Sequence, residues 1–293
     1  MAIIFYWSIV TCLFFICKKW CRYLVTNTKY YRANIIYFAY TKIQNDIIVL
    51  KTKSKGVVIM NITQYELAQM IDHTLLKPYV IMNDFYKLCN KAKKYKFKMI
   101  AINPALTEFC VNQLSGTGVN VGAAIGFPLG QNTLDCKIFE TKDAIAKGAK
   151  EIDYVINIVE LKSQNYDYIK KEMESIIEIC KTNNVTSKVI FENCYLTDDE
   201  KRKLCGIALE VLPDFNKTST GFGTGGATIE DVKLMKSIVG DQIKVKAAGG
   251  IRDLNTALAM IKAGAERIGT SSGVKIMEEF QEYKNLQMEG SDR

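Results

Sequence analysis

The sequence is nearly devoid of histidine: its 293 residues contain only His73. Zinc enzymes with several histidine ligands and hydrolases built on a Ser–His–Asp triad are therefore disfavoured. The chain also lacks a Walker pattern and a glycine fingerprint that opens a helix within a Rossmann unit. Hydrophobic residues make up 48% and charged residues 24% of the chain. That composition is typical of a globular protein and excludes disorder of the whole chain.

Acidic residues are almost missing from residues 1–60, which contain nine basic residues and only Asp46 as an acid. The remaining residues carry 30 charges of each sign and are neutral overall. The basic character therefore belongs to the N-terminal segment. A nucleic-acid-binding body needs a basic face of its own, so no nucleic-acid partner is expected.

The N-terminal segment is typical of a targeting leader. Residues 2–17 carry no charge, and the basic residues from Lys18 to residue 58 follow. The uncharged run is the length of a signal-peptide core and shorter than the roughly 20 residues of a membrane span. We expect a bipartite leader, residues 1–60, that directs the protein to a secondary plastid. The alternatives are a signal anchor, an upstream sequence that is never translated, and a cytoplasmic protein.

The body, residues 61–293, shows no C-x-x-C pair among its six cysteines. A body of this length can bury its own core without disulfides, so these cysteines are predicted to be reduced packing residues. They are Cys89, Cys110, Cys136, Cys180, Cys194 and Cys205. A polar tail is expected from about residue 281.

Eight short β-rich runs alternate with amphipathic segments in the body. This alternation predicts a parallel sheet, and eight units in about 233 residues favour a (β/α)₈ barrel. Capping boxes at Thr63–Glu66 and Thr197–Glu200 and the N-cap residues Thr228 and Asp253 mark helix starts. The predicted strands are 70–74, 98–103, 119–127, 151–158, 188–193, 213–219, 243–250 and 266–272.

Three glycine-rich segments follow predicted strands: residues 218–226, 247–250 and 269–273. In a barrel these positions form the C-terminal rim, where active sites are built. Their backbone N–H groups, with the hydroxyls of residues 269–273 before a last helix, suit a phosphate. The alternative is that the glycines are only turn residues.

Two lysines, Lys217 and Lys246, stand at the ends of neighbouring predicted strands, where a solvated charge is unexpected. Each alone could pair with a carboxylate or reach solvent. As a pair they predict an amine nucleophile, because a nearby cation and an apolar pocket lower the pKa of a lysine. Such an amine would form a Schiff base with a carbonyl. Asp153, inside an apolar strand, is the candidate for moving protons, or else a buried partner of a lysine.

The body resembles deoxyribose-phosphate aldolase over roughly residues 63–280. The combination of NKTSTGF (216–222) with VKAAGGIR (245–252) is the most specific part. The other matching segments are IDHTLLKP (71–78), NPALT (103–107), AIGFPLGQN (124–132), GAKEIDYVINI (148–158) and ERIGTSSG (266–273).

The resemblance implies a class I lyase that needs no metal or cofactor. It would cleave 2-deoxy-D-ribose 5-phosphate into D-glyceraldehyde 3-phosphate and acetaldehyde in the catabolism of deoxyribonucleotides and carbohydrates. It implies that Lys217 is the Schiff-base nucleophile, that Lys246 perturbs it, and that Asp153 transfers protons through water. The phosphate-binding and rim positions it implies are Gly221, Gly249, Gly250, Gly269, Ser271, Ser272, Asp72 and Thr74.

His73 lies between Asp72 and Thr74 on the opposite strand face and is expected to be structural. The C-terminal sequence does not align with a catalytic tyrosine, so Tyr283 receives no role. We expect a sugar phosphate as partner, no stable membrane association of the mature domain, and a homodimer as one possible assembly. Two alternatives stay open: another Schiff-base sugar-phosphate aldolase, and a non-catalytic barrel that binds phosphorylated ligands.

Overall fold

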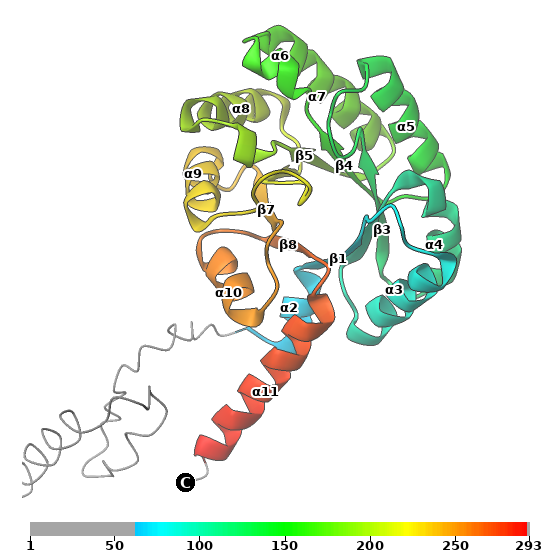
Figure 1. The fold of residues 1–293 in the computed structure, drawn as a ribbon, viewed down its shortest axis with the longest axis vertical. Helices are drawn as coiled ribbons and strands as arrows, with labels where there is room; N and C mark the ends of the chain where they lie inside the picture. The colour runs from blue at the N-terminus through cyan, green and yellow to red at the C-terminus, as the bar shows by residue number, and fades with distance from the viewer. Residues whose placement is uncertain (1–61, 292–293) are drawn as a thin grey trace, which may run out of the picture. The chain divides into compact units, whose positions relative to one another are not determined.

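A computed structural model describes residues 62–291, with side chains described to residue 285. Eight parallel strands form a closed barrel in which each strand pairs with the next and β8 closes onto β1. The helices surround these strands (Figure 1). The predicted (β/α)₈ barrel is therefore confirmed. The strands are β1 (Ile71–Leu75), β2 (Met99–Ile102), β3 (Asn120–Ile125), β4 (Glu151–Val155), β5 (Thr186–Ile190), β6 (Phe215–Lys217), β7 (Lys244–Ala248) and β8 (Arg267–Thr270).

The helices begin where the sequence supplies capping side chains. Thr63 and Glu66 form a reciprocal capping box, and Thr228 and Asp253 accept hydrogen bonds from N–H groups of the first turn of their helices. The α-helices are α2 (Gln64–Gln69), α3 (Met82–Tyr95), α4 (Thr107–Leu114), α5 (Leu134–Ala146), α6 (Ile158–Lys162), α7 (Tyr166–Thr182), α8 (Asp198–Val211), α9 (Ile229–Val239), α10 (Leu254–Lys262) and α11 (Gly273–Ser291). Two 3₁₀ turns, η1 (Pro104–Leu106) and η2 (Asn193–Tyr195), complete the elements.

The hydrophobic core lies between the outer faces of the strands and the helices. On β4, Ile152 and Tyr154 belong to this core, whereas Glu151 and Asp153 on the alternate positions are buried among charged residues. Because strand side chains alternate between faces, the apolar positions face the helices and the charged positions face the barrel axis. The interior of the barrel at β4 is therefore lined by charged side chains.

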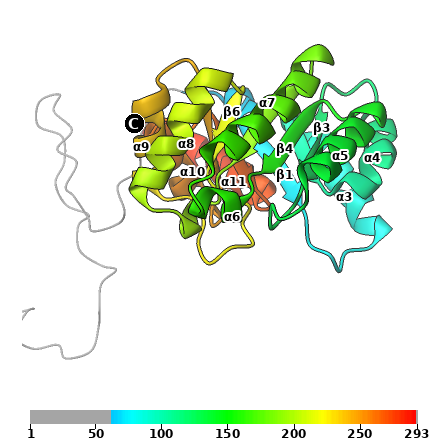
Figure 2. The same cartoon turned by 90° about the horizontal axis from the view of Figure 1, so that it is seen from above.

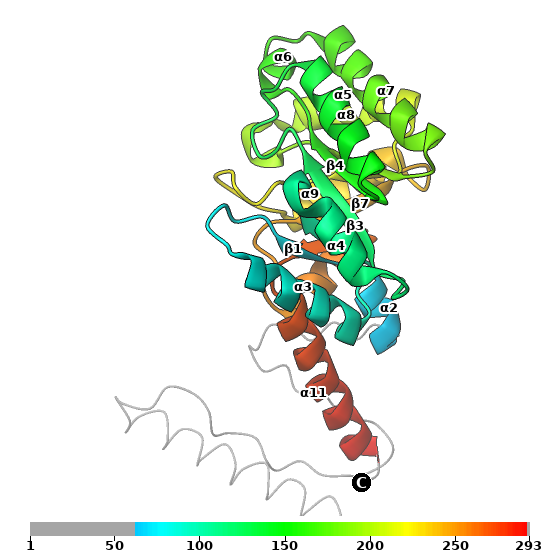
Figure 3. The same ribbon diagram turned by 90° about the vertical axis from the view of Figure 1, so that its right-hand side faces the viewer.

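The polar stretch expected from about residue 281 begins within α11, which continues as far as Ser291. Ile276, Met277 and Phe280 are buried in its first turns and anchor it to the core. Beyond them the helix extends away from the barrel (Figure 3).

The loops that follow the strands gather at one end of the barrel. Figures 2 and 3 both show the β1–α3 loop in cyan and the β6–α9 loop in yellow projecting on the same side. This is the carboxyl end of the strands, where the sequence placed the site. The predicted leader lies outside the described residues. Among the described residues, no helix combines the length and apolar character needed to cross a bilayer.

Candidate active site

Three lysines surround the carboxylate of Asp153 inside the barrel. Lys217 Nζ lies 2.9 Å and Lys246 Nζ 2.6 Å from Oδ2 of Asp153, and Lys188 Nζ lies 2.7 Å from Oδ1. All four residues are at most 3% exposed. Consecutive strands carry them: Asp153 on β4, Lys188 on β5, Lys217 on β6 and Lys246 on β7. The structure thus brings together the three predicted catalytic residues.

Further buried charges lie beneath this cluster. Asp72 binds Lys246 at 2.6 Å and Arg267 at 2.7 Å. Glu151 binds Lys188 at 2.6 Å and Arg267 at 3.3 Å. Each charged residue of this cluster therefore has a partner of opposite sign, which a buried ionic group requires.

Sequence reasoning missed Lys188, Glu151 and Arg267. A signal was present, because each alternates with apolar residues within a predicted strand or at its end. Two residues apart on β4, Glu151 and Asp153 share a face. If the inward-facing positions of all eight predicted strands are identified together, these three charged residues all point toward the barrel axis and are expected to meet there.

Burial is the main cause that lowers the pKa of Lys217 to about 8. Asp153 opposes this shift, while the charges of Lys246 and Lys188 add to it. Burial alone would raise the pKa of Asp153, but the three ammonium groups hold it well below its usual range. The site therefore combines an amine that deprotonates near neutral pH with a carboxylate that stays ionised.

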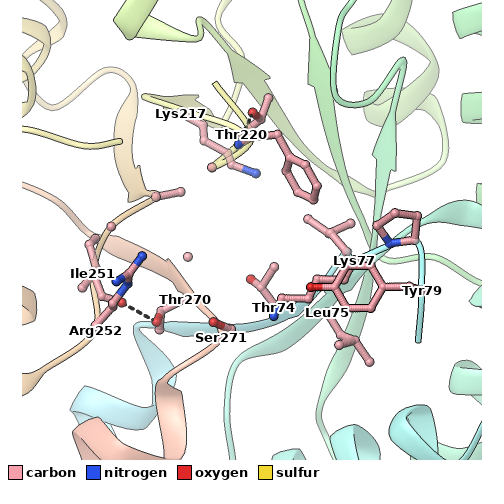
Figure 4. Close-up of a pocket in the computed structure, with 18 residues that line it drawn as sticks. Thr74, Leu75, Lys77, Tyr79, Lys217, Thr220, Ile251, Arg252, Thr270 and Ser271 are labelled. Carbon is pink, nitrogen blue, oxygen red and sulfur yellow. Dashed lines mark hydrogen bonds between the residues drawn. The ribbon is translucent and has the colours of Figure 1, made fainter. Parts of the chain in front are cut away.

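A pocket of about 510 Å³ lies at the carboxyl end of the strands, and Lys217 lines it. Figure 4 shows Lys217 on one side of the pocket and Arg252, Thr270 and Ser271 on the other. The predicted residues that line it are Lys217, Thr74, Gly221, Gly249, Gly250, Gly269 and Ser271. Thr220, Phe222, Lys77 and Tyr79 also line it and were not predicted as site residues.

Other predicted positions lie outside the pocket wall. Asp153 and Lys246 are buried behind Lys217. Asp72, expected on the rim, is fully buried, with its carboxylate bound to Lys246 and Arg267. Ser272 is half-buried, and its N–H donates to Thr270 Oγ1 at 2.9 Å. Asp72 is therefore a member of the buried charge cluster, where it holds Lys246.

Two glycine segments pack closely at the pocket. Gly221 and Gly249 have φ values of 86° and 84°, a region that side chains rarely adopt. A Cβ on Gly249 would lie 3.0 Å from Gly226 Cα and 3.3 Å from Gly221 Cα. Glycine is thus required for the two backbones to meet. Arg252 and Lys77 add positive charge to the same pocket, which suits an anionic ligand.

The single histidine stands apart from this chemistry. His73 is 4% exposed, and its ring centroid lies 5.0 Å from that of Phe97, on the helix side of β1. Burial and then the nearby Lys91 lower its pKa to about 4. The expected structural role fits this packing. The six described cysteines are free thiols, and four of them are buried.

Comparison with known proteins agrees with this geometry. Residues 60–279 match the family described as DeoC/LacD family aldolase. A protein of Bacteroides thetaiotaomicron named deoxyribose-phosphate aldolase is 58% identical over 235 residues, which cover 80% of this chain and 99% of that protein. One of Lactobacillus acidophilus with the same name is 60% identical over 217 residues, covering 74% of this chain and 92% of that protein.

Solved structures give the same result. A putative deoxyribose-phosphate aldolase from Coccidioides immitis is 35% identical with a TM-score of 0.73, covering 78% of this chain and 92% of that one. A tetrameric deoxyribose phosphate aldolase from Aeropyrum pernix is 33% identical with a TM-score of 0.70, covering 75% and 92% of the two chains. With its barrel, its buried lysine pair and these relatives, the chain belongs to the DeoC/LacD family of aldolases, and it is similar there to deoxyribose-phosphate aldolases.

Proposed function

We propose that this aldolase cleaves 2-deoxy-D-ribose 5-phosphate through a Schiff base on Lys217. The observation that carries the proposal is a buried amine of lowered pKa at the wall of a pocket with glycine-rich and cationic lining. An unprotonated amine can attack the aldehyde carbon of the sugar, and loss of water from the carbinolamine leaves a protonated imine. The same amine would serve another aldehyde substrate equally well, so the substrate rests on the relatives and on the phosphate-suited rim.

The imine then accepts the electron pair of the C2–C3 bond. The C3 hydroxyl loses its proton, C3 becomes the aldehyde of glyceraldehyde 3-phosphate, and C1 and C2 remain on Lys217 as an enamine. A proton added at C2 regenerates an imine, and water releases acetaldehyde. We assign the proton movements to Asp153 and Lys246, because the Lys246 ammonium and the Lys217 amine share one oxygen of Asp153.

A turnover assay tests the substrate. The full-length chain, treated with a chelator, is expected to release equal amounts of acetaldehyde and glyceraldehyde 3-phosphate from 2-deoxyribose 5-phosphate. Ribose 5-phosphate and fructose 1,6-bisphosphate serve as comparison substrates. Faster cleavage of either would favour another Schiff-base aldolase. Tight binding of sugar phosphates without turnover would favour the non-catalytic barrel.

We also propose that residues 1–60 direct the protein to a secondary plastid. An uncharged run at residues 2–17 followed by a basic, acid-poor stretch supports this. A fluorescent protein fused to residues 1–60 should enter the plastid, and one fused to residues 18–60 should stay in the cytoplasm. Cytoplasmic fluorescence from both fusions would reject the proposal.

For the assembly, we propose a homodimer. The support is general: most soluble oligomers are symmetric assemblies of identical chains, and dimers are the commonest. Light scattering coupled to size exclusion should give a mass near 66 kDa, about twice the 33.1 kDa of one chain. A tetramer, as in the Aeropyrum pernix structure, or a monomer would contradict it.

A further inference from the structure

A buried carboxylate outside the lysine cluster supports the loop that lines the pocket. Glu192 lies just after β5, is 2% exposed and does not line the pocket. Its Oε1 accepts the N–H of Thr220 at 3.1 Å, and its Oε2 accepts the Thr220 hydroxyl in a short hydrogen bond. The Cys194 thiol lies 3.8 Å from Oε1. All three of these groups are uncharged.

The backbone at Glu192 is also unusual. Its φ of 56° and ψ of 60° place it in the left-handed region, which a residue with a side chain adopts at a cost. Such a conformation persists only where the surroundings hold it, and it is found most often at functional sites. At Glu192 it coincides with a carboxylate turned inward onto Thr220. The position thus combines a strained backbone with a buried carboxyl group.

The loop that Glu192 contacts is otherwise weakly held in its middle. Both ends of the loop are fixed to β7, since Thr218 N–H donates to Lys246 O and Ala227 N–H donates to Ala248 O. Across residues 220–225, the described hydrogen bonds are those from Thr220 to Glu192 and from Phe222 N–H to Thr220 Oγ1. Four glycines fall within residues 221–226. A segment so rich in glycine loses its position easily without an anchor.

Thr220 transmits this support to the pocket. It lines the pocket together with Gly221 and Phe222, and Figure 4 shows it beside Lys217. The Phe222 N–H donates to Thr220 Oγ1 at 3.0 Å. A Cβ on Gly223 would lie 2.6 Å from Cys194 Sγ and 3.2 Å from Glu192 Cδ, so the loop passes Glu192 too closely to accommodate a side chain at this position. Movement of Glu192 would therefore displace the loop as a whole.

We propose that Glu192 is a positioning residue that holds loop 218–226 so that its backbone N–H groups face a substrate phosphate, and that it thereby sets the preference for phosphorylated over free sugars. The inference rests on the proposed function only in taking a sugar phosphate as the ligand. Glu192 touches neither substrate nor reacting atoms. It acts through Thr220 on an anion site made of backbone groups, which are sensitive to small shifts.

The test compares 2-deoxyribose 5-phosphate with 2-deoxyribose in the full-length chain and its variants. In Glu192→Gln we expect the KM for the phosphorylated sugar to rise about tenfold, the usual cost of losing one hydrogen bond to a charged group. We expect kcat/KM for free deoxyribose to stay within about twofold, since no phosphate is bound. Trapping of acetaldehyde on the protein with borohydride should proceed at the wild-type rate. Equal losses on both sugars would show a merely structural role and overturn the inference.

Thr220 supplies matched variants. Thr220→Val removes the hydroxyl and should reproduce Glu192→Gln, whereas Thr220→Ser keeps the hydroxyl and should lose less of the preference for the phosphorylated sugar. If Glu192 acts through Thr220, Glu192→Gln should have much less effect in the Thr220→Val background. Thr141→Val, on α5 and remote from the pocket, controls for the loss of a buried hydroxyl. Additive effects of the two site variants would contradict the proposed path.

A binding measurement separates this inference from the proposed function. The Kd of inorganic phosphate, followed by ³¹P NMR, should be about tenfold weaker in Glu192→Gln than in wild type. An unchanged Kd overturns the inference whatever the turnover. A third outcome is possible: the wild type binds phosphate, Glu192→Gln binds it more weakly, and neither protein cleaves the sugar. The inference then stands, and the assignment of the substrate is wrong.

Discussion

Lys217 and Lys246 face each other in register on neighbouring strands, as Cα partners of the β6–β7 pairing. Two ammonium groups so placed would repel each other, and a single oxygen of Asp153 lies between them. The positive charge of Lys246 so close to Lys217 adds to the effect of burial in lowering the pKa of Lys217 to about 8, so the Lys217 amine can lose its proton near neutral pH.

Replacing Lys217 by methionine should abolish catalysis while leaving the fold intact. Activity should fall at least about a thousandfold, because the proposed covalent intermediate forms on the Lys217 amine. Asp153 keeps Lys188 and Lys246 as partners, so no buried carboxylate is left unpaired. Lys244→Met, at the exposed start of β7, is the matched control and should keep full activity. Unfolding of Lys217→Met in circular dichroism would contradict the account.

The rate of imine formation should rise with pH through the pKa of Lys217, near 8. The reactive amine is the unprotonated form, so about one tenth of the protein is reactive at pH 7 and half at pH 8. Lys246→Met removes a cation that lowers this pKa, which should move the midpoint to higher pH. Stopped-flow trapping of acetaldehyde between pH 6 and 10 measures both profiles. A rate that still rises about tenfold per pH unit up to pH 10, with no plateau, would reject the lowered pKa.

The same pKa carries a consequence for stability. Lys217 has a folded-state pKa of about 8 and an ordinary value of 10.5, so the folded protein binds fewer protons than the unfolded chain between these values. Its contribution to folding therefore becomes more favourable as pH rises from 8 to 10.5. Lys217→Met lacks the buried amine, so at pH 8 its free energy of unfolding should exceed that of the wild type. In urea unfolding, this difference should shrink as the pH rises from 8 to 10.5. A growing difference would contradict the sign of the shift.

Replacing Asp153 by asparagine should damage both stability and catalysis. Three buried lysines would lose their shared carboxylate, which should cost about 3–5 kcal/mol in the free energy of unfolding. Urea denaturation measures this loss. Asp143→Asn, which removes a half-exposed partner of Lys147 on α5, is the control and should cost under about 1 kcal/mol. Equal costs for the two variants would show that the lysine cluster does not depend on Asp153.

Replacement by alanine should have different consequences at Gly226 and at Gly206. A Cβ on Gly226 would overlap the carbonyl oxygen of Gly249, so Gly226→Ala should push the two glycine loops apart and raise the KM for the sugar phosphate. On α8, a Cβ on Gly206 would meet nothing within 4 Å. Gly206→Ala should therefore stabilise the protein by about 1 kcal/mol without changing KM. Wild-type KM in Gly226→Ala would disprove the close packing.

The barrel and the clustering of the candidate catalytic residues could be predicted because they depend on local patterns. Each strand shows itself as a short apolar run, and Lys217 and Lys246 stand out at the ends of two such runs. The eight strands are confirmed, with ends that differ by a few residues. Capping side chains such as Thr63 and Thr197 fixed helix starts, because the N-cap bond is made within one turn.

The remainder of the charge cluster could not be predicted from local patterns. Arg267 binds Asp72 across 195 residues of sequence, and their meeting depends on closure of β8 onto β1. Strand periodicity places Asp72 on the inner face but does not give its depth, so it was expected on the rim. The polar composition after residue 281 does not indicate a helix by itself, and α11 is anchored by buried residues before that point.

The most direct test of the account is to map the covalent intermediate. The full-length protein is incubated with 2-deoxyribose 5-phosphate and sodium borohydride and then digested for mass spectrometry. We expect an acetaldehyde-sized addition on Lys217 and none on Lys246 or Lys188. An addition on another lysine, or none in a folded protein that turns over the sugar, would contradict the assignment of Lys217 as nucleophile.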